Sequence, residues 1–105
     1  MLPKSNYLNF LKLNEKKLDT PDITIVAAFY KFFEIRDTNA LQNLLKSILN
    51  DTEIKGTILI AKEGVNGTIA GTKNEISLAL EKLWRLDVLI DLEPKYSFAY
   101  KNPFF

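Results

Sequence analysis

The sequence predicts an α+β fold in which one antiparallel sheet of four strands carries two helices on a single face. Two observations predict it: strand-like and helix-like patterns follow one another in the order β-α-β-β-α-β, and 105 residues suffice for one hydrophobic core. Hydrophobic residues make up 47% of the chain and charged residues 26%, which is typical of a globular domain and not of a disordered segment.

The first half of the pattern is a strand, a helix and a strand. Residues 23–33, ITIVAAFYKFF, are apolar on both faces and rich in β-branched and aromatic residues, which predicts a buried central strand. Residues 39–50 carry leucine and isoleucine at the spacing of one helix face, and Asp37 or Thr38 is expected to cap this helix. Residues 55–64, KGTILIAKEG, predict the second strand.

A hairpin is predicted to join the second strand to a third at residues 66–72. Its loop is expected at residues 63–67, where Gly64 and Gly67 would supply the turn and Asn66 would adopt a left-handed backbone. The loop sequence KEGVNG therefore has a purely structural interpretation, which stays open beside the functional one given below.

The second half of the pattern is a helix followed by a last strand. Thr72 and Glu75 have the spacing of a capping box, which predicts a helix at residues 73–86. The last strand is expected to start at Pro94 and to end at Pro103, because its aromatic residues alternate at period two.

This order of elements is the ferredoxin-like or acylphosphatase-like arrangement, whose helices leave one face of the sheet open. The first strand has an apolar set of side chains on each face, so one set is expected to face another domain, a second copy of the chain or a ligand. Residues 1–22 are expected to form an N-terminal extension, which is an arm or a short helix capped by Ser5. This extension is the alternative cover for the open face of the sheet. Residues 23–105 are expected to form the ferredoxin-like domain.

The composition excludes several kinds of chemistry. The chain has no Cys and no His, which excludes a thiolate nucleophile, a Cys-ligated zinc ion and an imidazole base. The acidic residues are dispersed, and no metal site is expected. No apolar run is long enough to span a membrane, and a cytoplasmic location is expected. The net charge of +1 alone does not indicate a nucleic-acid binder, so that function would need a local basic patch.

Four stretches of the sequence resemble a known family. They are VAAFYKFFEI, the long run IKGTILIAKEGVNGTIAG, an Asp-Leu-Glu segment and KNPF, and together they extend from about Val26 to Phe104. In these stretches the chain resembles the N-terminal domain of the rhodanese-containing tRNA uridine hydroxylases. The resemblance implies a cytoplasmic enzyme that hydroxylates position 5 of the wobble uridine with molecular oxygen, and whose rhodanese domain carries the essential Cys.

The chain departs from the family pattern because it lacks Cys and ends at NPFF, where family members continue into the rhodanese domain. The resemblance therefore implies a domain with no catalytic residue and no cofactor of its own. This domain would contribute to tRNA binding and would pack on the rhodanese domain.

Residues near the strand ends are expected to contact the RNA. Basic side chains would meet phosphates there, Asn66 would add a polar contact, and Tyr30 or Phe32 would stack on an unpaired base. The predicted RNA-binding residues are Lys31, Arg36, Lys55, Lys62 and Asn66.

Two other functions stay open. The first is an interaction module that forms a dimer through the open sheet face. The second is an acylphosphatase-like enzyme that handles phosphate through Arg36; the loop that carries this residue, FEIRDTNA, contains no glycine, which disfavours a phosphate cradle of backbone amides.

Overall fold

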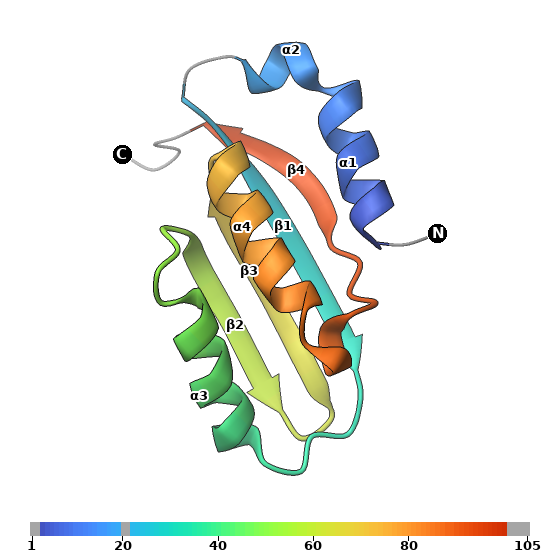
Figure 1. Cartoon of the computed structure of the whole chain (residues 1–105), viewed down its shortest axis with the longest axis vertical. Helices are drawn as coiled ribbons and strands as arrows, with labels where there is room; N and C mark the ends of the chain where they lie inside the picture. Colours follow the sequence, from blue (N-terminus) through green and yellow to red (C-terminus); the bar gives the residue numbers. More distant parts are fainter. Residues whose placement is uncertain (1–2, 20–21, 101–105) are drawn as a thin grey trace.

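A computed structural model describes residues 3–19 and 22–100 of the chain. The predicted order of strands and helices is confirmed, and two helices precede the first strand (Figure 1). Pro103, the predicted end of the last strand, lies outside the described residues. The elements are α1 (Pro3–Leu13), α2 (Glu15–Leu18), β1 (Ile23–Phe32), α3 (Thr38–Leu49), β2 (Lys55–Ala61), β3 (Gly64–Gly71), α4 (Lys73–Trp84), the short 3-10 helix η1 (Asp87–Leu89) and β4 (Lys95–Tyr100).

The four strands form one antiparallel sheet in the order β2-β3-β1-β4, which confirms the predicted ferredoxin-like fold. Strand β1 lies between β3 and β4, as its apolar sequence predicts. The register places Ala28 opposite Thr68 of β3 on one side and opposite Lys95 of β4 on the other. Pairing between β1 and β4 ends at Ala28, so the last part of β1 has a strand neighbour on one side only.

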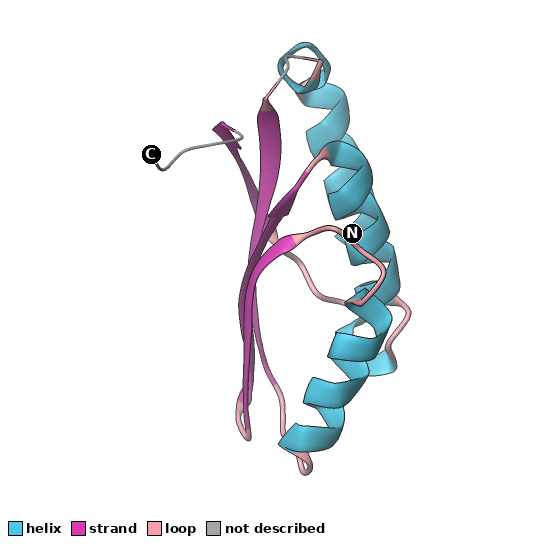
Figure 2. Cartoon of the chain, turned by 90° about the vertical axis from the view of Figure 1, so that its left-hand side faces the viewer, coloured by secondary structure: helices cyan, strands magenta, loops and turns pink. Residues whose placement is uncertain are grey.

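All helices lie on the same side of the sheet (Figure 2). The alternation along β1 follows from this arrangement. Ile25, Ala27 and Phe29 are buried beneath the helices, whereas Tyr30 and Phe32 project from the opposite side and are exposed. The structure thereby assigns the two apolar sets: the one that includes Val26 and Tyr30 belongs to the open face.

Helix α1 covers the part of the sheet that α3 and α4 leave uncovered on the helix side. The rings of Tyr7 and Phe10 pack on β4, with ring centroids 5.2 and 5.1 Å from that of Tyr96. The Tyr7 hydroxyl also lies 2.6 Å from the Ser77 hydroxyl of α4. Helix α1 begins at Pro3, so Ser5 lies inside its first turn and does not cap it. These contacts leave the open face of the sheet without a cover from residues 3–19.

The hairpin between β2 and β3 is tighter than predicted, because β3 begins at Gly64. The prediction that Asn66 has a left-handed backbone is wrong, since this residue pairs with Tyr30 inside the strand and its φ is not positive. Gly64 does need the permissive backbone: its φ is 150°, and a Cβ there would lie 2.1 Å from the Lys31 carbonyl oxygen. Asn66 is therefore held by the sheet and not by a mobile loop tip.

The predicted caps of α3 and α4 are confirmed. The Asp37 side chain accepts a hydrogen bond from the Ala40 N–H at 2.9 Å, so Asp37 and not Thr38 caps α3. The capping box of Thr72 and Glu75 starts α4. Trp84 at the end of α4 is buried, as expected, and its Nε1–H donates to the Leu92 carbonyl oxygen at 2.8 Å.

Tyr7→Ala should lower the free energy of unfolding by about 3–5 kcal/mol, because it removes a buried aromatic ring and the hydrogen bond to Ser77. Urea denaturation would measure the change. Leu13→Ala, at a side chain that is 74% exposed on the same helix, should change the stability by less than about 0.5 kcal/mol. Equal, small effects of both variants would contradict the packing of α1.

Candidate nucleic-acid interface

The open face is a grid of side chains fixed by the strand register. Residues paired across neighbouring strands share a face, so the even-numbered residues of β1 define rows across it, three of which lie in its middle. The first row is Leu59–Asn66–Tyr30, the second is Thr57–Thr68–Ala28–Lys95, and the third is Lys55–Ala70–Val26–Ser97.

The described strand positions on this face include no Asp or Glu. They include two lysines, Lys55 on β2 and Lys95 on β4, both exposed. Among the described residues neither lysine has an ion-pair or hydrogen-bond partner, whereas Lys4, Lys31 and Lys82 are each paired with a carboxylate. The open face is thus a positively charged surface on a chain whose net charge is only +1.

One end of the open face is apolar. Tyr30, Phe32 and Leu59 are 67%, 77% and 63% exposed. The rings of Tyr30 and Phe32 pack edge to face, with centroids 5.5 Å apart, and together with Leu59 they line a shallow hollow. Large apolar side chains clustered in this way on a water-facing sheet indicate a binding surface.

The structure places only some of the predicted RNA-binding residues on the open face. Asn66 lies there, between Leu59 and Tyr30, and Lys55 lies on the same face farther along β2. Lys62 and Arg36 belong to two loops that run side by side at the aromatic end, where the Ile35 N–H donates to the Lys62 carbonyl oxygen at 2.9 Å.

Lys31 has a different environment from the other predicted contacts. Its side chain leaves the helix side of β1 and is three-quarters buried. Its Nζ donates to the Val88 carbonyl oxygen and to Asp91 Oδ1, both at 2.5 Å. This hydrogen bond lowers the pKa of the Asp91 carboxyl and outweighs the opposite effect of desolvation. These two hydrogen bonds of Lys31 therefore connect β1 to the segment of residues 88–91, which lies between α4 and β4.

Sequence analysis missed Lys95. It follows Pro94 at the start of β4, and its side chain faces opposite to those of Tyr96 and Phe98. The signal was present in the sequence: once the aromatic residues of this strand face the helices, alternation directs Lys95 to the open face.

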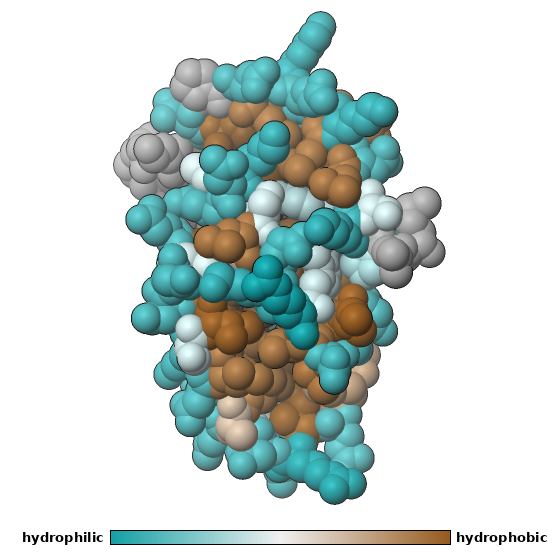
Figure 3. All heavy atoms as spheres, in the orientation of Figure 1, coloured by the Kyte–Doolittle hydropathy of each residue, from teal (hydrophilic) through white to brown (hydrophobic). Residues whose placement is uncertain are grey.

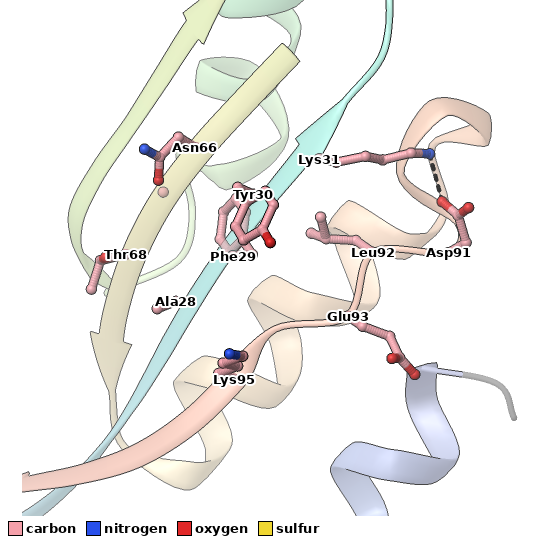
Figure 4. A pocket seen from close by; sticks show the side chains of 11 residues that line it. Ala28, Phe29, Tyr30, Lys31, Asn66, Thr68, Asp91, Leu92, Glu93 and Lys95 are labelled. Carbon is pink, nitrogen blue, oxygen red and sulfur yellow. Dashed lines mark hydrogen bonds and ion pairs between the residues drawn. The ribbon is translucent and has the colours of Figure 1, made fainter.

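A second hollow, of about 430 Å³, lies where β4 begins (Figure 4). Tyr30 of β1, Asn66 and Thr68 of β3, and Lys95 of β4 rise around it, and Asp91 and Glu93 lie at its rim. Both carboxylates are engaged away from the hollow, because Asp91 pairs with Lys31 and Glu93 accepts a hydrogen bond from Asn6 of α1.

Within residues 3–19 and 22–100, no group of three or more Asp, Glu, His or Cys side chains is arranged to hold a metal ion. None of the helices in these ranges is long and apolar enough to cross a membrane.

Comparison with known proteins assigns the family. The family model of the UPF0176 acylphosphatase-like domain matches residues 24–105, which is most of the chain. The chain belongs to this UPF0176 family. The match confirms the resemblance noted from the sequence, and it starts at Thr24, the second residue of β1.

Curated relatives of this UPF0176 domain carry the name tRNA uridine(34) hydroxylase. The chain is 44% identical over 81 residues to the protein of Teredinibacter turnerae, covering 77% of the chain and 25% of the relative. It is 46% identical over 81 residues to that of Prochlorococcus marinus and 41% identical over 81 residues to that of Acaryochloris marina, covering 75% and 77% of the chain and 25% and 26% of the relatives. The chain spans about a quarter of the length of these relatives.

Lys31→Met should raise the pKa of the Asp91 carboxyl toward its ordinary value, because the hydrogen bond and the charge of Lys31 that lower it are lost. In the unchanged protein the stabilisation from this pair is present above the pKa of the unfolded state and is lost as the pH falls through the lower pKa of the folded state. Carboxyl NMR titration would measure the shift. The pKa of Asp51, which Lys82 lowers, should stay unchanged and serves as the control. An Asp91 pKa that is the same with and without Lys31 would contradict the pairing.

Proposed function

We propose that this domain holds single-stranded RNA on its open sheet face and supplies no catalytic group, within an enzyme that hydroxylates the wobble uridine of tRNA. The relatives are named for this reaction, and the present chain contains neither Cys nor His. The observation that carries the proposal is the open face, whose described strand positions carry no Asp or Glu but do carry two lysines without a described partner and exposed aromatic rings.

The charge distribution on this face complements a nucleic-acid backbone. Lys55 and Lys95 lie on the two outer strands, with the threonine and alanine side chains of the inner strands between them. Phosphates are attracted to lysines that have no competing carboxylate nearby, and binding releases the counterions of the RNA. The strand positions of this face carry no carboxylate that would repel a phosphate.

The aromatic end supplies the second requirement of a single-stranded RNA site. Exposed rings on the central strand of an open sheet can stack on unpaired bases, as they do in other four-stranded RNA-binding sheets. Tyr30 and Phe32 are in this position. The wobble nucleotide lies in the anticodon loop, which offers unpaired bases, so a tRNA fits the chemistry of the face.

The alternative of a phosphate-handling enzyme has less support. Arg36 extends from the loop after β1 with a side chain that is 91% exposed and lies 3.8 Å from a Glu34 oxygen. Asn66 belongs to β3 and faces the open side. It pairs with Tyr30 of β1, and Arg36 follows Tyr30 by six residues, so the sheet does not bring Asn66 and Arg36 to the same position. A dimer through Tyr30, Phe32 and Leu59 is the remaining alternative, and sedimentation would detect it.

We also propose that the second domain of the hydroxylase, the rhodanese domain, packs on the helix side of the sheet. Figure 3 shows this side, where apolar side chains gather around α3 and the end of α4. Leu44, Val88 and Ile90 are 43%, 42% and 62% exposed there. A domain that packs on this surface leaves the open face accessible to RNA.

The double variant Val88→Asp, Ile90→Asp should weaken association of this domain with a separately purified rhodanese domain by at least about tenfold, because it places two charges in an apolar contact. Isothermal titration would measure the affinity. Lys55→Asp on the opposite face is the matched control and should leave it unchanged. Equal loss in both variants would contradict the assignment of the two faces.

The double variant Lys55→Ala, Lys95→Ala should weaken binding of an anticodon stem-loop and reduce the slope of log K against log salt by about 1.4, because two phosphate contacts are lost. Fluorescence anisotropy at several salt concentrations would measure both quantities. The double variant Lys12→Ala, Lys46→Ala removes two exposed lysines on the helix side and should leave the slope unchanged. An unchanged protein that does not bind RNA even at low salt would overturn the proposal.

A further inference from the structure

The hollow at the start of β4 arises because one strand is shorter than its neighbour. Strand β4 pairs with β1 through Ala28, and Pro94 precedes its first residue. Beyond Ala28 the outer edge of β1 faces the segment of residues 91–93, which is not a strand. Backbone N–H and C=O groups alternate in direction along an antiparallel strand. Because the Phe33 N–H donates to Glu63 on the β3 side, those of Tyr30 point to the open edge.

The lining of the hollow combines the three features that recognise one nucleotide. The Tyr30 ring forms an aromatic wall, the Asn66 amide carries one hydrogen-bond donor group and one acceptor, and Lys95 carries a positive charge. The volume of about 430 Å³ lies within the roughly 300–1,000 Å³ range of small-ligand sites.

The nearby carboxylates do not oppose an anionic ligand as strongly as their positions suggest. Figure 4 shows Asp91 directed toward Lys31, and Glu93 directed away from Lys95. The charge of Asp91 is balanced by an ammonium group at 2.5 Å, and Glu93 accepts the hydrogen bond from Asn6. Among the residues that the structure describes, Lys95 is the lysine beside the hollow that has no ion-pair or hydrogen-bond partner.

We propose that this hollow is a subsite for one unstacked nucleoside of RNA, whose base lies on Tyr30 and contacts the Asn66 amide while its phosphate contacts Lys95. This inference rests on the proposed RNA-binding function and adds to it a defined nucleotide position on the sheet. The Tyr30 backbone groups at the open edge of β1 offer a further donor and acceptor to the base. A ligand that carries only sugar and phosphate would meet Lys95 but neither the aromatic wall nor the amide.

The test uses the full chain and two small probes, uridine 5′-monophosphate and ribose 5-phosphate. The nucleotide should shift the backbone NMR signals of Tyr30, Asn66 and Lys95, and ribose 5-phosphate should bind at least about tenfold more weakly because it has no base to stack. Tyr30→Ala should weaken nucleotide binding by about tenfold or more. Asn66→Ala should do the same to a smaller extent, and Asn43→Ala, an exposed asparagine on α3, should have no effect.

The outcomes separate this inference from the proposed function. Binding of the stem-loop that depends on Lys55 and Lys95, combined with equal binding of the two small probes, would overturn the nucleoside subsite and leave the RNA-binding function standing. Shifts confined to residues outside the hollow would overturn it in the same way. Failure of both the stem-loop and the nucleotide to bind would overturn both proposals.

Discussion

The position of β1 between two strands, beneath helices on one side only, is the constraint on which the rest of the structure depends. A central strand cannot hide its second face unless another layer covers it, and no such layer is formed by the described residues. Ile25, Ala27 and Phe29 therefore form the middle of the core, and the residues between them form the middle of the open face. The ten residues of β1 thus contribute one face to the core and the other face to the candidate site.

The N-terminal helices make this asymmetry complete. Strand β4 directs Tyr96 and Phe98 to the helix side, beyond the reach of a two-helix layer centred on the other three strands. Helix α1 supplies the missing cover through Tyr7 and Phe10, whose rings lie against Tyr96 and Phe98. Apolar burial is thereby concentrated on one side, and the charged and aromatic side chains of the open face stay accessible.

Most of the fold could be predicted from the sequence because its signals are local. The capping residues Asp37 and Thr72 mark the helix starts, and alternation marks the strands. The position of Asn66 could not be predicted in this way, because Asn and Gly are typical of turns and depleted in strands, yet here they pair within β3. The role of Lys31 was also hidden, because its partner Asp91 lies sixty residues away in the chain. Which set of β1 side chains faces outward depended on the helices, and not on β1 itself.

The candidate site is consequently a property of the register more than of any motif. Lys55 and Lys95 are forty residues apart in the sequence, and each is only one of many lysines. Strand pairing brings them to the same face, and none of the described strands contains Asp or Glu. A basic patch of this kind does not show in the net charge of the chain.

The contact between α1 and β4 also has a kinetic consequence. The first helix of the chain rests on its last strand, so the two partners are separated by more than eighty residues of sequence. Closing so long a loop is entropically costly until the intervening sheet has brought its ends together. During synthesis Tyr7 and Phe10 therefore stay in water until β4 itself has been made.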